Sequence, residues 1–333
     1  PYLPTDRFRA LLSGVDLPAQ THGAALMVDM SGFTQMAVDL VVKYGESAGE
    51  RLGRRLNPMF ELIAGQIFHH GGSVIRFLGD GFTAWFDDTH RPTAETSPRP
   101  LPGVLRAVVA GMGIQEVMHI YKELRHKICV GVGEADRWVV GMPSYGLNDV
   151  LSGEAVSRMI SLSGEAQPEQ VMVHRDALPT LRAAHIGLEI TDTGNALITA
   201  VPRAIQDSAR AYRWMPYDAG DDLSGALERI APFVDAALRE RIESGIGNFS
   251  DELRHAIPMF IQVEVSSNAL NPQAALNHYV CGVQEKIAVF GGRLMSVEVS
   301  DKGSVLFVVF GAPITYGDDA ERALRFAMTL REM

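Results

Sequence analysis

The sequence contains very little cysteine: Cys129 and Cys281 are the only two in 333 residues. They lie far apart, and neither belongs to a Cys-x-x-Cys pair, the spacing that commonly binds zinc. A disulfide framework and a cysteine-based metal site are therefore both poor explanations of this chain. We expect two buried free thiols in a reducing compartment.

Positive charge and long apolar runs are also scarce. Thirty lysines and arginines stand against forty aspartates and glutamates, a formal net charge of −10. This balance argues against a nucleic-acid partner, because non-specific binding needs a basic face. No apolar run approaches the ~18–20 residues that cross a membrane, and PYLPTDRFRALLSG lacks the basic-then-apolar order of a signal peptide. We expect a cytoplasmic protein with no membrane partner.

What is present is the composition of a globular protein, with 47% apolar and 21% charged residues. The length is sufficient for two domains of ordinary size. The chain begins at Pro1 and stops at Met333 within a helical pattern. We therefore expect a fragment, with further C-terminal domains in the full chain.

The first part of the chain alternates strand and helix patterns. A strand is predicted at 24–30, then a helical stretch at 34–70 with a break near Asn57-Pro58 and an end at Gly71-Gly72. SVIRFL and FTAWF predict a hairpin joined through Gly79-Asp80-Gly81. Later come a helix at 104–125, a strand pair in KICVGVG and RWVVG, a short helix at 154–163 and a strand in EQVMVH. This order is typical of an α+β, ferredoxin-like sheet with helices on one face.

The same pattern returns after a predicted helical linker at 201–254. AIPMFIQVEVSSNAL resembles the first strand, a helix ends at Gly291-Gly292, and two strands flank Asp301-Lys302-Gly303. The repeat predicts two ferredoxin-like domains, 20–200 and 255–333, that pack as an intramolecular pseudo-heterodimer. The second copy is truncated, because its pattern stops after the helix in DDAERALRFAMTL. We expect the chain to be a monomer.

Two aspartates of the first copy stand at strand ends. Asp29 is near the end of the first strand, and Asp80 is at the tip of the hairpin. We expect the first strand of the hairpin to lie beside strand one, so that the two carboxylates converge. Paired carboxylates are the oxygen ligands that Mg²⁺ and Mn²⁺ prefer, and two such ions can assist an in-line attack at phosphorus.

The segment DMSGFT adds a candidate phosphate site beside Asp29. Ser31 and Gly32 precede a predicted helix start, where backbone amides and the helix dipole favour an anion. An Asp-Gly turn or a capped helix start is usually structural when it occurs alone. Their joint occurrence at this spacing, with a repeat behind it, favours a chemical site.

At this point the residues resemble a known family. MVDMSGFT, the Gly71-Gly72 pair and RFLGDGFTAWF resemble the class III nucleotidyl cyclases. The tandem arrangement, DELR at the end of the linker, DKGSVLFVVFGAP and DDAERAL resemble the soluble, bicarbonate-responsive adenylyl cyclase branch. The resemblance covers nearly all of the chain from about residue 20.

The resemblance implies a reaction and a set of roles. ATP would be converted to 3′,5′-cyclic AMP and pyrophosphate by attack of its 3′-hydroxyl on the α-phosphorus. Asp29 and Asp80 would bind two Mg²⁺ or Mn²⁺ ions, with a backbone carbonyl from Met30. The triphosphate would lie on the segment Ser31, Gly32, Phe33 and Thr34.

The resemblance also implies a second cleft, which takes bicarbonate in the soluble branch. Arg76 stands where soluble cyclases commonly carry a lysine lining that cleft, and Arg158 could face it too. Together they are a candidate regulatory anion site. A charge at a solvated strand edge is an equally good interpretation of Arg76.

The chain departs from the family where the second domain should read the base. No lysine stands between Arg293 and Lys302, and Ser296 or Glu298 occupies that region instead. Lys302 lies in the turn itself, where the first copy has Asp80, so only one catalytic cleft is expected. The asparagine and arginine of the family's transition-state helix would fall on Ser157 and Ser161 in the first copy, and the chain ends before that helix in the second.

Two alternatives follow from these departures. The chain could be a degenerate cyclase pair that senses a nucleotide or an anion for a larger regulator. A diguanylate cyclase shares the palm-like fold, but the turn Leu78-Gly79-Asp80-Gly81-Phe82 does not match its motif. The choice between ATP and GTP stays open, because the base-reading residues are altered.

Overall fold

The computed structural model describes residues 3–78, 81–92, 100–215, 222–234, 239, 255–264, 270–300 and 303–331. Gly79, Asp80, Asp301 and Lys302 lie outside these ranges, as does most of the second half of the predicted linker. In the described ranges no helix combines the length and the apolar character required to cross a membrane.

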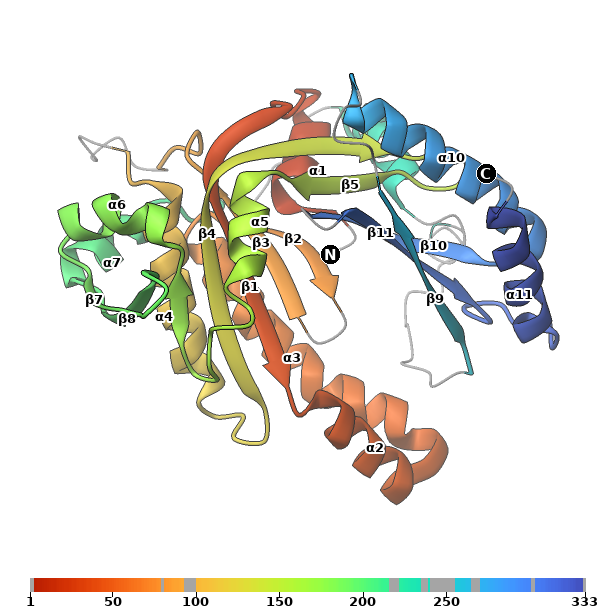
Figure 1. Cartoon of the computed structure of the whole chain (residues 1–333), viewed down its shortest axis with the longest axis horizontal. Helices are drawn as coiled ribbons and strands as arrows, with labels where there is room; N and C mark the ends of the chain where they lie inside the picture. Colours follow the sequence, from red (N-terminus) through yellow and green to blue (C-terminus); the bar gives the residue numbers. More distant parts are fainter. Residues whose placement is uncertain are drawn as a thin grey trace.

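The first sheet is built around a ferredoxin-like core (Figure 1). Four strands lie in the order β2-β3-β1-β4 with antiparallel pairing throughout, and helices connect β1 to β2 and β3 to β4. The elements are β1 (Gln20–Ser31), α2 (Phe33–Tyr44), η1 (Gly45–Ser47), α3 (Ala48–His69), β2 (Ser73–Leu78), β3 (Gly81–Asp87), α4 (Gly103–Met118) and β4 (Arg125–Val140).

The sheet continues beyond this core. β6 pairs in parallel with β4, β8 and β7 follow it, and β5 pairs with the far end of β4. The elements are β5 (Asn148–Ser152), α5 (Glu154–Ser161), β6 (Val171–Val173), η2 (Arg175–Ala177), α6 (Leu178–Ala183), β7 (Gly187–Ile190), β8 (Ala196–Ala200), α7 (Arg203–Arg210), α8 (Leu223–Ile230) and η3 (Ala231–Phe233).

The two faces of this sheet are covered differently. α3 and α4 pack on one face, where Val28, Met59 and Val108 belong to the main core. α5 packs on part of the other face against Ala25 and Cys129. The expectation that helices cover one face is therefore wrong. The cause is Gly131 in β4: a Cβ there would lie 2.2 Å from the carbonyl oxygen of Ala155, so only glycine admits α5 this closely.

The second sheet repeats the strand order of the first. Its strands lie in the order β10-β11-β9, all antiparallel, just as β2-β3-β1 do in the first core. The elements are β9 (Ile257–Val263), α10 (Pro272–Phe290), β10 (Arg293–Ser300), β11 (Gly303–Phe310) and α11 (Asp319–Leu330).

The repeat extends to individual packing contacts. A Cβ on Gly72 would lie 2.6 Å from the ring of Phe86, and a Cβ on Gly292 would lie 2.6 Å from the ring of Phe310. β2 has an irregular register between Val74 and Arg76, and β10 has one between Leu294 and Ser296. Both irregularities start two residues after the glycine pair, so Ser296 corresponds to Arg76.

The two sheets meet where β4 and β5 reach α10 and β10. Val140 and Val150 are buried in one cluster with residues of the second sheet, among them Val280 and Val297. Gln284 fixes the junction: its Oε1 accepts from the Met142 amide at 2.8 Å, and its Nε2 donates to the Gly146 carbonyl at 2.7 Å. The Gly141 amide donates to Asn277 Oδ1 at 2.8 Å.

Two predictions about the helices and long strands are wrong. The helical stretch breaks at η1 and not at Pro58, which lies inside α3. Buried Leu56 and Met59 on either side of Pro58 hold the helix on the core, which outweighs the lost backbone hydrogen bond. KICVGVG and RWVVG form one continuous strand, β4. Its first part packs in the core of the first sheet, and its end packs where the two sheets meet.

A third prediction concerned the order of strands. The second strand of the hairpin, β3, lies beside β1, while the first strand, β2, is at the edge. The prediction that the first strand of the hairpin lies beside β1 is therefore wrong. The convergence of Asp80 with Asp29 stays a prediction, because Asp80 lies outside the described residues.

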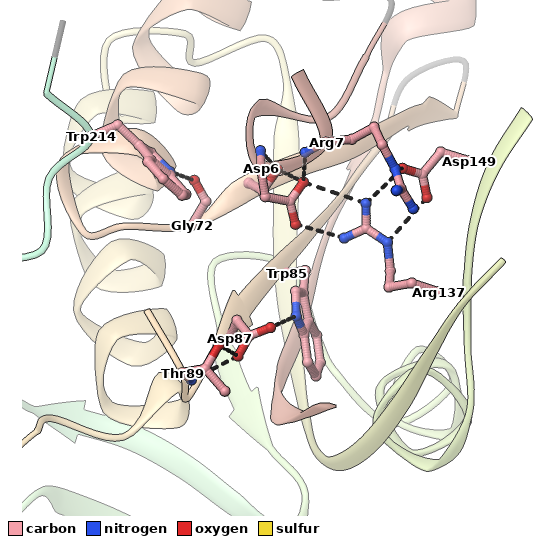
Figure 2. A network of polar contacts seen from close by, with 10 residues as sticks. Asp6, Arg7, Gly72, Trp85, Asp87, Thr89, Arg137, Asp149 and Trp214 are labelled. Carbon is pink, nitrogen blue, oxygen red and sulfur yellow. Dashed lines mark hydrogen bonds and ion pairs between the residues drawn. The ribbon is translucent and has the colours of Figure 1, made fainter. Parts of the chain in front are cut away.

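An N-terminal helix, α1 (Thr5–Ser13), was not expected, and it carries a buried charge network (Figure 2). Arg137 on β4 donates to Asp6 at 2.6 Å and to Asp149 at 2.8 Å, and Arg7 donates to Asp149 at 2.7 Å. The side chains of Arg137 and Asp149 are 3% and 2% exposed. Two positive and two negative groups thus neutralise one another where α1, β4 and β5 meet.

Both cysteines are free thiols. Cys129 lies in the core beneath α5, where burial raises the pKa of its thiol to about 12. Such a thiol stays protonated at neutral pH and is chemically inert.

Candidate functional site

Asp29 lies near the end of β1, on the sheet face opposite α3 and α4. Its neighbours Val28 and Met30 point into the main core, so the alternation of the strand directs Asp29 the other way. Its side chain is 38% exposed, and its Oδ2 lies 3.2 Å from Nζ of Lys127, the residue opposite it on β4. The carboxylate is therefore reachable by solvent and already has one cation beside it.

Lys127 is held in place from its other side. Its Nζ donates to the carbonyl oxygen of Ser163, just beyond α5, at 2.6 Å. This contact could not be predicted from local patterns, because Lys127 meets Asp29 only through the pairing of β1 with β4.

The start of β3 lies next to Asp29. Phe82 pairs with Val28, the residue before Asp29, and β3 begins one residue earlier at Gly81. Asp80 falls outside the described residues. Its convergence with Asp29 consequently stays a prediction, which the position of Phe82 supports.

The segment after Asp29 turns sharply into α2. Gly32 has φ 97°, and a Cβ there would lie 2.8 Å from the carbonyl oxygen of Glu123, so this position needs glycine. No side chain of the described residues caps α2, which leaves its first amides open to an anion as far as those residues are concerned. Ser31 and Thr34 are exposed, whereas the ring of Phe33 packs against the core and leaves only its backbone for a ligand.

The donors at this position suit a hard divalent cation. The Asp29 carboxylate and backbone carbonyls such as that of Met30 are oxygen ligands of the kind Mg²⁺ and Mn²⁺ prefer. Among the described residues no group of three or more His, Cys, Asp or Glu forms a ready metal cluster. A metal at Asp29 would share the carboxylate with Lys127 or displace it.

A second site lies between the two sheets. A cavity of about 140 Å³ is lined by β1, β2, β3, β5 and α5 on one side and by β10 and β11 on the other. Arg76 enters it from β2, and its Nη1 lies 3.7 Å from Oε1 of Glu298 on β10. The Arg76 side chain is only 15% exposed, and burial lowers its pKa while Glu298 opposes that effect.

The structure does not bring Arg76 and Arg158 together. Arg158 donates to the Val132 carbonyl at 2.8 Å and pairs with Asp176 at 3.0 Å, and it does not line the cavity that holds Arg76. Arg76 is no solvated edge charge either, because its partner Glu298 comes from the second sheet. Lys302, the remaining second-domain candidate, lies outside the described residues.

The repeat identifies the position that corresponds to Asp29. Phe86 and Phe310 make the same packing contact, and they pair with Ala24 and Ile257 respectively. Five residues further along, Asp29 on β1 corresponds to Gln262 on β9. The second sheet therefore has a neutral amide where the first has its carboxylate. This difference was not predicted from the sequence, because β1 and β9 can be aligned only through the strands with which they pair, β3 and β11.

Comparison with known proteins gave matches only among solved structures. No family model matches the chain, and no curated relative matches it. The adenylyl cyclase CyaB from P. aeruginosa is similar at 15% identity over 55% of this chain and 96% of that chain, with a TM-score of 0.42.

Two further similar structures are the guanylate cyclase domain of RhGC from Catenaria anguillulae in complex with GTP and a bacterial light-regulated adenylyl cyclase. The first has 14% identity over 56% of this chain and 100% of that chain, with a TM-score of 0.43. The second has 14% identity over 69% of this chain and 64% of that chain, with a TM-score of 0.43. These three solved structures are adenylyl and guanylate cyclases.

Proposed function

We propose that the chain is a nucleotidyl cyclase that converts ATP to 3′,5′-cyclic AMP and pyrophosphate. One observation carries the proposal: a reachable carboxylate and an uncapped helix start adjoin each other at one strand end. Asp29 lies on the face that α3 and α4 leave free, and three residues later Gly32 turns the chain into α2. A metal–triphosphate needs this combination of oxygen ligand and backbone amides.

In this proposal Asp29, Asp80 and the Met30 carbonyl hold two Mg²⁺ or Mn²⁺ ions. The ions would favour ionisation of the 3′-hydroxyl and neutralise the departing pyrophosphate. The amides of Ser31 to Thr34 bind and orient the triphosphate. The 3′-oxygen forms a bond to the α-phosphorus as the bond from that phosphorus to the pyrophosphate oxygen breaks, and the hydroxyl proton passes to solvent.

We place the site in the first of two tandem domains, 20–200 and 255–333, joined by a linker at 201–254 and paired within one chain. The common strand order of the two sheets supports this pairing. Gln262 in place of Asp29 supports a single catalytic site per chain. We propose no bicarbonate site, because the charge of Arg76 is already paired with the carboxylate of Glu298.

A second candidate is a nucleotide-binding module without turnover. Ser296 and Glu298 support it, since a base-reading lysine is missing from β10 and Glu298 is engaged with Arg76. Loss of base recognition would weaken the alignment of the 3′-hydroxyl more than it weakens triphosphate binding.

Turnover and binding assays separate the two candidates. The chain is incubated with ATP or GTP and Mg²⁺ or Mn²⁺, and cyclic nucleotide is quantified by chromatography. A cyclase gives metal-dependent product, which Asp29→Asn and Asp80→Asn each reduce by about a hundredfold or more. Asp192→Asn, an exposed carboxylate in the β7–β8 turn, keeps full activity and is the matched control.

Calorimetry with a non-hydrolysable ATP analogue completes the test. Binding that depends on Asp29, without any product, would establish the binding module. Neither product nor binding, in a chain that is folded by circular dichroism, would overturn both candidates.

A further inference from the structure

A large cavity lies on the side of the first sheet opposite Asp29. It has a volume of about 870 Å³ and is formed by the end of α3, by α4 and by α7 with the residues after it, three helices that lie side by side (Figure 1). This volume falls within the range of about 300–1,000 Å³ that is usual for small-molecule sites. The main core separates it from the candidate nucleotide site.

The walls of this cavity carry an unusual share of positive and titratable groups for a chain with net charge −10. Arg210 and Arg213 line it from one side, while Glu116 is the one carboxylate among its lining residues. Arg210 has Asp207 on its own helix at 3.3 Å. Arg213 is exposed and has no carboxylate partner in the part of the chain that the structure describes.

A buried histidine also contributes to the wall. His70 is 6% exposed, and its Nδ1 lies 2.7 Å from the carbonyl oxygen of Gln66. A carbonyl only accepts, so Nδ1 carries the hydrogen. Burial lowers the pKa of His70, which keeps the ring neutral and leaves Nε2 as an acceptor. Nε2 has no partner among the described residues, so it can accept a hydrogen bond from a donor in the cavity.

We infer that this cavity is a binding site for a small organic phosphate monoester that carries hydroxyl groups. The phosphate binds Arg210 and Arg213, whose guanidinium groups form charge-assisted hydrogen bonds with phosphate oxygens. A hydroxyl of the same molecule donates to Nε2 of His70. Gln66, on α3 one turn before His70, adds an amide that can donate or accept.

The site is placed to influence β2, the strand that precedes Asp80. Arg213 lies between Tyr212 and Trp214, and Trp214 donates its Nε1 hydrogen to the Gly72 carbonyl at 2.7 Å, directly before β2 (Figure 2). The Tyr212 carbonyl accepts from His90 Nε2 at 2.9 Å. A ligand that fixes Arg213 therefore fixes the segment that holds the start of β2.

Calorimetry on the 333-residue chain tests the inference, with ribose 5-phosphate, glucose 6-phosphate, ribose and inorganic phosphate as probes. We expect at least one of the two sugar phosphates to bind with a stoichiometry of one, more tightly than ribose or inorganic phosphate. Arg213→Gln and Arg210→Gln should each weaken that binding by about tenfold or more, because each removes a charge-assisted contact. Arg203→Gln, an exposed arginine on α7 outside the cavity, is the matched control and should bind like the original chain.

Asp29→Asn distinguishes this cavity from the nucleotide site. Binding of the sugar phosphate should be unchanged in this variant and should persist in the presence of an ATP analogue. Absence of binding by both sugar phosphates at millimolar concentration would overturn the inference. An equal loss in Arg203→Gln, or a loss in Asp29→Asn, would overturn it as well, since binding would then be unspecific or located elsewhere.

Discussion

Lys127 determines the electrostatic surroundings of Asp29. It reaches the carboxylate from the neighbouring strand at 3.2 Å and is anchored by the Ser163 carbonyl. A divalent cation at Asp29 must therefore approach a fixed positive charge. Both side chains are partly exposed, so solvent screens much of this repulsion.

Replacing Lys127 should strengthen metal binding. We expect Lys127→Gln to lower the dissociation constant for Mn²⁺ by about threefold, because one nearby positive charge is removed from a partly screened site. Titration of free Mn²⁺ by electron paramagnetic resonance measures this directly. Lys122→Gln, on the exposed loop before β4, is the control. A weaker affinity in Lys127→Gln would show that Lys127 positions Asp29 more than it repels the metal.

The buried carboxylate of Asp6 makes stability depend on pH. Burial by itself would raise the pKa of Asp6, but the charge and hydrogen bonds of Arg137, with those of Ser73 and the Arg7 amide, lower it below the ordinary 3.8. A carboxyl with a lowered pKa stabilises the fold above its unfolded pKa. That contribution is lost as pH falls through the lower folded-state pKa.

We therefore expect the urea midpoint of the chain to fall as pH drops below about 4. Asp6→Asn should be less stable at neutral pH, because Arg137 loses one of its two partners, and its midpoint should vary less over the acid range. Chemical unfolding at a series of pH values measures both. An unchanged acid slope in Asp6→Asn would assign the pH dependence to other carboxylates.

At the scale of elements, the repeat is carried by the glycine pairs that follow α3 and α10. Gly72 and Gly292 each lie under a phenylalanine ring of the neighbouring strand, and a Cβ at either would be 2.6 Å from that ring. Gly72 and Gly292 thus make the same packing contact in the two sheets.

Gly72→Ala and Gly292→Ala should each destabilise the protein by about 1–3 kcal/mol, because buried aromatic rings on both sheets would have to move. Gly65→Ala in α3, where a Cβ would meet no atom within 4 Å, should be neutral or slightly stabilising. Urea unfolding of the three variants gives the comparison. If Gly72→Ala and Gly292→Ala unfold like the original chain, the packing of the two phenylalanine rings is looser than the 2.6 Å distances indicate.

Local patterns were sufficient to predict most of the core elements. The hairpin β2–β3, the glycine ends of α3 and α10, and the strands of the second sheet follow from alternation, turn residues and helix termination. The neighbour of β1, the continuity of β4 and the contact of Lys127 with Asp29 could not be predicted that way. Each depends on which strands pair, and pairing over long sequence distances leaves no local signal.

The pairing of Arg76 with Glu298 in the cavity between the sheets could not be predicted from local patterns either. A lone arginine on an edge strand gives no sign in the sequence that it will be covered by a second sheet. The proximity of Asp29 to the hairpin was predicted, because strand ends and tight turns are local features. Buried partners were not predicted, because they come from the other half of the chain.

At the scale of the whole molecule, Gln284 on α10 makes two hydrogen bonds to the segment between β4 and β5. Its side chain is almost fully buried and bonds both the Met142 amide and the Gly146 carbonyl. Apolar contacts around Val140 and Val150 enclose it. Removal of this amide leaves two backbone groups of the junction without a partner.

We expect Gln284→Ala to lower the free energy of unfolding by about 2–4 kcal/mol, which combines a lost side chain with two unsatisfied backbone groups. Unfolding followed by tryptophan fluorescence and by circular dichroism should separate into two transitions if the junction loosens first. Glu285→Ala, one residue further and exposed on the same helix, should behave like the original chain. A small loss with a single transition would place the strength of the junction in its apolar contacts instead.

One strand, β4, belongs to the cores of both sheets, and this has a practical consequence for dividing the gene. A piece that ends near residue 200 would keep β4 but lose the residues of the second sheet that cover Val140 and Val150. The fragment would expose an apolar surface at this end and should self-associate when it is produced alone. Co-expression with the second half should restore solubility, so the two pieces would act as a split protein whose reassembly can be followed in cells.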